Sequence, residues 1–257
     1  MPELPDLEVY KKYIDSTALH KKIDEVEITE DRVVEPDNDK LKTELKDKKF
    51  SETHRHGKYL FLDYGSGWLM MHFGMSGNVK YFKNDEERDE HQRVLFHLEN
   101  GYSLAYVSQR MLGKIDLSES PDKYCSDNNI GPDAYRLSES DFVEKIKSKR
   151  GMIKTALMDQ SLISGIGNIY SDEILFHARI HPETKISDLS DDDVRHIYEK
   201  MQKVFDEAIA GNVRKFPDNF LIPRREEGTS CPKCGGEVEK LEVGGRSTYI
   251  CSRCQSL

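Results

Sequence analysis

The chain has 257 residues, which is enough to bury one large core or two ordinary ones, and two domains are the default expectation. No apolar run approaches the ~18 residues of a membrane span and no basic, apolar leader of the secretory type opens the chain, so we expect a cytoplasmic protein without membrane contact. The formal charge of −9 disfavours a broad nucleic-acid-binding surface but leaves room for a local basic patch.

The first six residues, Met1-Pro2-Glu3-Leu4-Pro5-Asp6, carry a candidate nucleophile. If Met1 is removed, Pro2 presents a secondary amine on a rigid ring, which is less basic than a lysine amine and is partly unprotonated near neutral pH. Attack on a sugar C1′ would give an iminium ion, and Glu3 is placed to handle the protons of such a reaction. The alternative is structural: Pro2 only permits removal of Met1, and Pro5 begins a helix as a first-turn proline.

After this start the sequence predicts one helix and then a β-rich region. Apolar residues at helical spacing predict an amphipathic helix over residues 6 to about 20. Short apolar or alternating runs then predict strands of a β-sandwich or barrel, over 23–29, 59–64, 68–73, 78–82, 94–98 and 102–107. Residues 118–132, rich in Ser, Asp, Asn and Pro, are a candidate linker.

Beyond residue 132 the pattern becomes helical. Capping motifs and apolar spacing predict helices over 141–147, 152–158 and 169–178, and a long helix that begins after Ser190 and ends at Gly211. The turn 164–170 places two glycines before a helix start, where free N–H groups can bind a phosphate. A turn between two helices needs glycine in any case, so both interpretations stay open.

The most specific spacing lies near the end of the chain. Cys231 and Cys234, followed after sixteen residues by Cys251 and Cys254, form the four-thiolate pattern of a zinc ribbon. Disulfides are disfavoured in a cytoplasmic chain, and a redox CxxC pair needs a thioredoxin-like context that the sequence lacks. Four sulfur ligands leave no open position for water, so we expect one structural zinc ion, with Cys125 an ordinary thiol.

Several motifs follow one another along the chain: Pro2-Glu3-Leu4-Pro5, His56-Gly57-Lys58-Tyr59-Leu60, His72-Phe73-Gly74-Met75-Ser76-Gly77, Gly165-Ile166-Gly167-Asn168-Ile169-Tyr170 and the ribbon with Gly245-Arg246-Ser247-Thr248. In this order they resemble the formamidopyrimidine-DNA glycosylase/endonuclease VIII family.

The resemblance implies an α+β multidomain fold. Its parts are an N-terminal catalytic β-sandwich with a leading helix (1–117), a linker (118–132), a helix-two-turn-helix DNA-binding domain (133–224) and a C-terminal zinc ribbon (225–257). The resemblance also implies a monomer that binds damaged double-stranded DNA and is nucleoid-associated if the source is prokaryotic.

By the same resemblance the protein is a bifunctional DNA glycosylase and abasic-site lyase of base excision repair, acting on oxidised or ring-opened bases. Pro2 attacks C1′ of a nucleotide whose base has been turned out of the stack, and Glu3 is the acid/base in base loss and ring opening. Lys58 matches the position implicated in proton donation and phosphate contact. Arg246 matches the position implicated in the second of two eliminations, β and then δ, and no catalytic metal is required.

Further positions match family residues that contact DNA. Those matching phosphate contacts or other DNA-binding residues are His72, His91, Arg110, Lys149, Lys154 and Asn168. Those aligned with side chains that fill the space left by the extruded base are Met75, Arg110 and Leu112. Phosphate contacts position a duplex without reading its sequence, and apolar wedges offset lost stacking. Each residue taken singly has an ordinary structural explanation, and only their joint placement favours the functional one.

Two departures from the family pattern bear on the substrate. Leu112 stands where many relatives carry an aromatic wedge. The charged segment 213–230 is short for the loop that closes over the extruded base in the branch that excises 8-oxoguanine. Ring-opened purines, oxidised pyrimidines and abasic sites need less of a lid and therefore stand beside 8-oxoguanine as candidate substrates, although the Pro-Glu-Leu-Pro start resembles the formamidopyrimidine branch.

Two other functions stay open from the sequence. A non-catalytic damaged-DNA-binding protein would keep the fold but would have no use for a processed Pro2 beside Glu3. A ribosome-associated zinc protein would carry similar helical and ribbon elements, with the N-terminal motif accidental. Retention of Pro2, Glu3, Lys58 and Arg246 together favours the enzyme.

Overall fold

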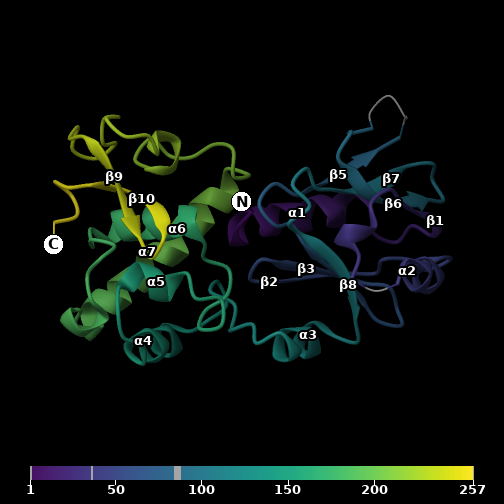
Figure 1. Ribbon diagram of the computed structural model, residues 1–257, viewed down its shortest axis with the longest axis horizontal. Coiled ribbons are helices and arrows are strands. Elements are labelled where there is room, and N and C mark those ends of the chain that lie inside the picture. The colour runs from purple at the N-terminus through teal and green to yellow at the C-terminus, as the bar shows by residue number, and fades with distance from the viewer. Residues whose placement is uncertain (1, 36, 84–87, 257) are drawn as a thin grey trace. The chain divides into compact units, whose positions relative to one another are not determined.

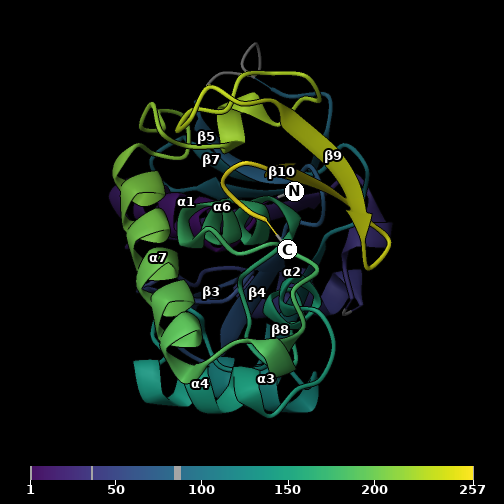
Figure 2. The ribbon, with the colours of Figure 1, turned by 90° about the vertical axis from the view of Figure 1, so that its left-hand side faces the viewer.

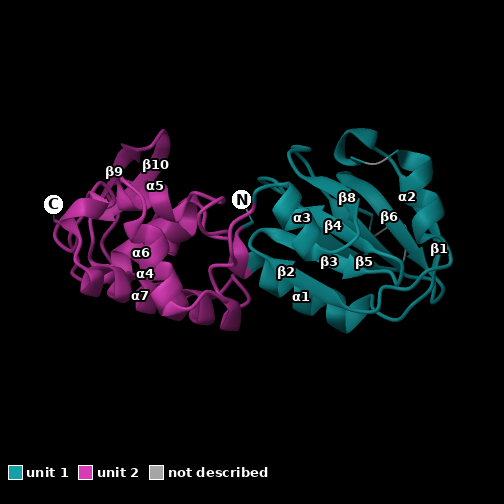
Figure 3. Cartoon of the chain, turned by 90° about the horizontal axis from the view of Figure 1, so that it is seen from below, with its two compact units in different colours: residues 1–2, 6–129 teal, residues 3–5, 130–257 magenta. Residues whose placement is uncertain are grey.

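The computed structural model describes residues 2–35, 37–83 and 88–256. The chain divides into two compact units, the first with Pro2 and residues 6–129 and the second with residues 3–5 and 130–257 (Figure 3). The tripeptide Glu3–Pro5 thus belongs to the second unit, although the residues on either side of it belong to the first. Within the described ranges, no helix is both long and apolar enough to cross a membrane.

Antiparallel sheets form the framework of the first unit (Figure 1). Among its described residues one sheet has the strand order β1-β6-β7-β5 and the other β2-β3-β4-β8. The strands are β1 Ile23–Ile28, β2 Thr53–His56, β3 Tyr59–Asp63, β4 Trp68–His72, β5 Asn78–Phe82, β6 Gln92–Leu98, β7 Ser103–Val107 and β8 Lys114–Ser118. Leu60 and Met71 of one sheet share a buried core with Phe96 and Leu104 of the other, so the predicted sandwich is confirmed.

Helices cover part of this core. Helix α1 (Leu4–Thr17) buries Leu7 and Ile14 in it, and Pro5 lies in the first turn as a proline can. The sequence did not predict α2 (Asn38–Leu45), the 3-10 turn η1 (Asp31–Val33), β2 or β8.

The segment 118–132, expected to be a linker, instead contains helix α3 (Pro121–Asp127). Ser120 caps α3 by accepting the N–H of Lys123 at 3.1 Å, and Pro121 occupies the first turn. A cap and a first-turn proline therefore make a short helix out of a composition typical of loops.

The second unit is built around one buried helix. Every residue of α6 (Asn168–Ala178) from Tyr170 onwards is buried, and α7 (Asp191–Ala210) runs beside α6 (Figure 2). The predicted capping box at Ser190 and Asp193 is present at the start of α7. The other elements are α4 Glu139–Lys147, α5 Ile153–Leu157, the 3-10 turns η3 Ile186–Asp188 and η4 Ile222–Arg224, and the hairpin of β9 Val238–Val243 and β10 Arg246–Cys251.

The N-terminal tripeptide inserts at the turn before α6. Leu4 is fully buried in the helical core, and its N–H donates to the Gly165 carbonyl at 3.1 Å. Gly165 has φ +118°, and a Cβ at this position would lie 2.5 Å from Leu4 Cδ1. Glycine is therefore required both for the backbone conformation and for the close approach of Leu4.

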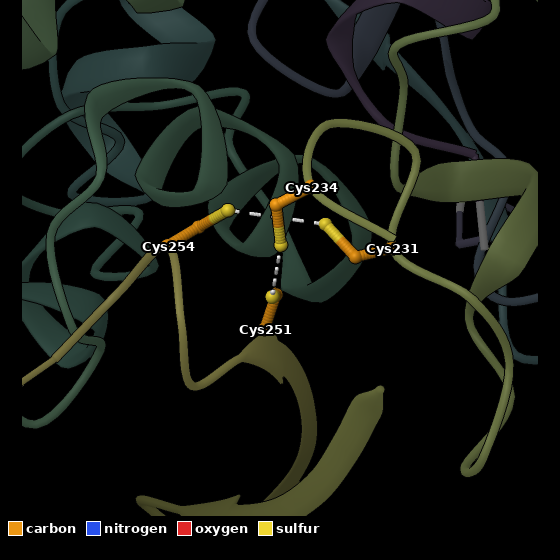
Figure 4. A group of neighbouring side chains, drawn as sticks. All are labelled: Cys231, Cys234, Cys251 and Cys254. Atoms are coloured by element: carbon orange, nitrogen blue, oxygen red, sulfur yellow. Dashed lines mark hydrogen bonds between the residues drawn. The ribbon is translucent and has the colours of Figure 1, made fainter. Parts of the chain in front are cut away.

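Four cysteines close the ribbon hairpin (Figure 4). Their sulfur atoms all lie within 4.8 Å of one another, with 3.9 Å between Cys231 and Cys254 and 3.5 Å between Cys234 and Cys251. A tetrahedral site with Zn–S bonds of ~2.3 Å has S···S edges of about 3.8 Å. Backbone N–H groups two residues beyond Cys231 and Cys234 donate to these sulfurs at 3.4 Å. The donor set therefore fits one four-coordinate zinc.

Replacing Gly165 with alanine should destabilise the second unit, because the added methyl group meets Leu4. Gly151→Ala is the matched control, since Gly151 has φ +97° but nothing within 4 Å of the added Cβ. Thermal unfolding should show a loss of about 1–3 kcal/mol for G151A from backbone strain alone. The loss for G165A should be about 1–3 kcal/mol larger, from overpacking. Equal losses would show that Leu4 does not occupy this position in solution.

The sulfur geometry predicts one zinc per chain, measurable by inductively coupled plasma mass spectrometry. Cys231→Ser should abolish stoichiometric zinc, because three thiolates hold the ion less tightly than four. Cys125→Ser alters a buried thiol of the first unit and should retain the metal. Full zinc content in the Cys231 variant would contradict the assignment of the four ligands.

Candidate active site

The carboxylate of Glu3 is held at the first turn of α6. Its Oε2 accepts the N–H groups of Gly167 at 2.7 Å and Tyr170 at 3.2 Å, and its Oε1 accepts the N–H of Ile169 at 2.9 Å. The side chain is fully buried, at a helix end where negative charge is favoured. The turn that the sequence offered as a phosphate site thus binds the protein's own carboxylate.

Pro2 is constrained by this contact, because one peptide bond joins it to Glu3. Pro2 itself is partly exposed. Met1 lies outside the described residues, so its removal stays a prediction. With Glu3 and Leu4 both buried in the second unit, the backbone leading to the Pro2 nitrogen has little freedom.

Lys58 and His72 lie close together in the first unit. Lys58 directly precedes β3 and is only 8% exposed, while His72 ends β4 and pairs with Tyr59 across the strands. Burial, together with the positive charges of Lys58 and Lys114, lowers the pKa of His72 to about 4. His72 is therefore neutral at pH 7, so it would meet a phosphate as a hydrogen-bond donor and not as a cation.

Two adjoining loops of the first unit carry the residues expected to fill the DNA stack. Met75 is 45% exposed and Leu112 is 55% exposed, and Arg110 is also exposed. The Arg110 N–H donates to Ser76 Oγ at 3.3 Å, and a Cβ on Gly74 would lie 2.4 Å from the Leu112 carbonyl carbon. The structure thus brings together the two loops that carry these three exposed side chains, and insertion of the side chains into DNA stays a prediction.

Asn168 and Arg246 are connected through the ribbon hairpin. The Asn168 side-chain amide, at the start of α6, donates to the Ser247 carbonyl at 2.9 Å. Ser247 directly follows Arg246, whose side chain is exposed at the start of β10. The same helix end therefore holds Glu3 and one strand of the hairpin.

Lys154, expected to contact a phosphate, is completely buried. Its ammonium donates to Asp172 Oδ1 and to Thr248 Oγ1, each at 2.6 Å. Because this ammonium is fully buried and already donates to these two groups, Lys154 does not present it to a phosphate in this structure. The sequence analysis did not identify Asp172 as the partner of Lys154. The only sequence signal was that this carboxylate lies one helical turn after Asn168.

His91 and Lys149 lie at the surface beside acidic groups. His91 Nε2 lies 3.2 Å from Glu90, and Lys149, 41% exposed, lies 3.1 Å from Asp159. Ion pairs this exposed are weak, so a DNA phosphate could replace either carboxylate. The DNA contacts of both residues stay predictions.

Profiles of three known domain families match this chain. The formamidopyrimidine-DNA glycosylase N-terminal domain matches residues 1–115, and the formamidopyrimidine-DNA glycosylase H2TH domain matches residues 130–216. The zinc finger found in FPG and IleRS matches residues 230–257. Together with the sulfur cluster, this last match assigns one structural zinc to the four cysteines.

Whole-chain comparisons agree with the domain matches. Formamidopyrimidine-DNA glycosylases of Pelotomaculum thermopropionicum and Streptococcus pyogenes serotype M3 are 32% and 30% identical to this chain. The alignments cover 100% and 99% of this chain and 100% and 98% of the relatives.

Solved structures are also similar. A Lactococcus lactis Fpg in complex with DNA containing an abasic site has a TM-score of 0.89 at 28% identity, over 99% of this chain and 100% of that one. A MutM in complex with DNA containing carbocyclic 8-oxo-G has a TM-score of 0.90 at 28% identity, over 100% of both chains. The chain therefore belongs to the formamidopyrimidine-DNA glycosylase family, whose members are DNA glycosylases of base excision repair.

Proposed function

We propose that this protein is a bifunctional DNA glycosylase and abasic-site lyase. It removes damaged bases through a Schiff base on Pro2 and cleaves the strand by β- and then δ-elimination. The observation that supports this most is the docking of Glu3, whose carboxylate accepts three backbone N–H groups. A protein that only binds damaged DNA has no need to immobilise a carboxylate beside its N-terminal amine.

The first half of the reaction replaces the damaged base by the protein. After removal of Met1, the Pro2 nitrogen attacks C1′, the bond from C1′ to the base breaks, and the base leaves with a proton. Opening of the C1′–O4′ bond then gives an iminium ion between Pro2 and the sugar. We assign to Glu3 the transfer of protons to the departing base and to O4′.

The second half uses the iminium as an electron sink. It acidifies the C2′ hydrogen, so a modest base can remove this proton while the C3′–O bond breaks. Loss of the C4′ proton then breaks the C5′–O bond, and hydrolysis of the imine restores the Pro2 amine. Lys58 and Arg246 supply positive charge to the phosphates as they leave.

We propose that damaged duplex DNA is the partner, since solved relatives are bound to DNA that contains an abasic site, Fapy-dG or carbocyclic 8-oxo-G. The proposed contacts are His72, His91, Arg110, Lys149 and Asn168, with Met75, Arg110 and Leu112 filling the space of the extruded base. The three family matches support domains over 1–117, 133–224 and 225–257, with 118–132 between the first two.

The segment 213–230 bears on substrate choice. Glu173, fully buried in α6, accepts the N–H groups of Leu221 at 2.9 Å and Ile222 at 2.6 Å. Phe220 is buried in the helical core, and Arg225 donates a hydrogen bond to Asp172. A segment held at so many points offers little chain to close over a base. We therefore propose that ring-opened purines, oxidised pyrimidines and abasic sites are better substrates than 8-oxoguanine.

Borohydride should trap the protein covalently on abasic duplex DNA, because hydride reduces the iminium. Pro2→Gly should lower lyase turnover, and Glu3→Gln should slow base excision by about 10²-fold while affecting a preformed abasic site much less. Glu144→Gln, at an exposed position of α4, is the control and should change neither rate.

Absence of an adduct would favour a non-catalytic damaged-DNA-binding protein with the same fold. Equal loss of excision and abasic-site cleavage in Glu3→Gln would overturn the role assigned to Glu3.

A panel of duplexes carrying one lesion each tests the substrate proposal. Values of kcat/KM for a ring-opened purine should exceed those for 8-oxoguanine by about tenfold, because segment 213–230 offers little chain to close over an extruded 8-oxoguanine. Faster excision of 8-oxoguanine than of the other lesions would show that another part of the chain closes over the base.

A further inference from the structure

A buried cluster of charges joins α6 to the ribbon hairpin. Asp172 and Lys154 are fully buried, and Arg225 is 13% exposed. Asp172 Oδ1 accepts from Lys154 at 2.6 Å, and its Oδ2 accepts from Arg225 at 2.8 Å and from the Tyr249 N–H at 3.1 Å. One carboxylate therefore binds α5, the segment before the ribbon, and strand β10.

The same cluster is connected to the backbone of Arg246. Lys154 donates its second hydrogen bond to Thr248 Oγ1 at 2.6 Å, and the Thr248 hydroxyl donates to the Arg246 carbonyl at 3.0 Å. Asn168, one turn before Asp172 in α6, binds the Ser247 carbonyl at 2.9 Å. Consecutive residues of β10 are thus tied to one helix, either directly or through Lys154.

The turn of the hairpin also packs closely against α5. A Cβ on Gly244, at φ +58°, would lie 2.6 Å from Thr155 Cγ2. Thr155 follows Lys154 in the chain, so the hydrogen bonds and this contact fix the hairpin from the same side.

Burying these charges is costly, so their presence calls for an explanation other than stability. Burial raises the pKa of Asp172 and lowers that of Lys154, and the opposite charge of each partner works against these shifts. The charge of Arg225 also lowers the pKa of Asp172, and the charge of Glu3 raises the pKa of Lys154. Buried ion pairs are often no more stabilising than apolar residues of similar volume, and fixing one arrangement of the chain is an established use for them.

We propose that Asp172 is a positioning residue that holds the Arg246 hairpin in place for the second elimination. Asp172 touches no DNA and acts through Lys154, Thr248 and the Tyr249 N–H. The inference rests on the proposed lyase function. It also changes the role expected of Lys154, from contacting a DNA phosphate to linking Asp172 with Thr248.

Asp172→Asn is the primary test, because asparagine keeps the volume but brings a donor where three donors already converge. On abasic duplex DNA, borohydride trapping should stay within about twofold of the wild type, since Pro2 and Glu3 are untouched. The ratio of δ- to β-elimination product should fall about tenfold, because a displacement near 1 Å can cost up to 10²-fold in rate. Zinc content should stay at one per chain.

Glu173→Gln is the matched control. Glu173 is the next residue of α6 and is as fully buried, but it binds Leu221 and Ile222 instead of the hairpin. It should lower stability without changing the product ratio. A wild-type ratio in Asp172→Asn, or an equal change in Glu173→Gln, would overturn the proposal.

Two further measurements cover the cases in which the primary test fails. If Asp172→Asn does not fold, Thr248→Val removes only the hydroxyl between Lys154 and the hairpin, and a wild-type product ratio in this variant would overturn the proposal. If the wild type forms no adduct, the proposed function fails by itself. Amide hydrogen exchange of β10, expected to be faster in Asp172→Asn than in Glu173→Gln, then decides whether Asp172 holds the hairpin, and equal exchange would refute it.

Discussion

The binding of the Glu3 carboxylate to the first turn of α6 is the constraint on which the rest of the site depends. A helix start with free N–H groups is a general anion site, and here the anion comes from the third residue of the chain. Leu4 and Gly165 make the docking specific, because the side chain of Leu4 fills the space that a Cβ would need. The position of the Pro2 amine follows from this contact through a single peptide bond.

Helix α6 organises its unit through three buried carboxylates. Its N-terminus binds Glu3, its Asp172 binds the ribbon hairpin, and its Glu173 binds the segment that leads to the ribbon. Each contact ties a segment distant in sequence to the same helix. In a chain of net charge −9, these three acids are engaged inside the protein, whereas Arg110 and Arg246 are exposed, and we propose that both arginines face the DNA.

The sequence predicted those features that local patterns determine. Apolar alternation located most strands of the sandwich, capping residues located α4 and α7, and cysteine spacing located the zinc site. Strand β2, Thr-His-Arg-His, has no apolar pattern, and it forms because it pairs with β3 and because buried Arg55 meets Glu8 at 2.7 Å. The burial of Lys154 was equally hidden, since Asp172 and Thr248 are remote from it in the chain.

The central claim is that the Pro2 nitrogen forms the bond to deoxyribose. Tandem mass spectrometry of the proteolysed, borohydride-reduced adduct tests it most directly. The account predicts an N-terminal peptide that lacks Met1 and carries the sugar remnant on Pro2. A remnant on a lysine such as Lys58, or an adduct-bearing protein that still begins with Met1, would contradict it.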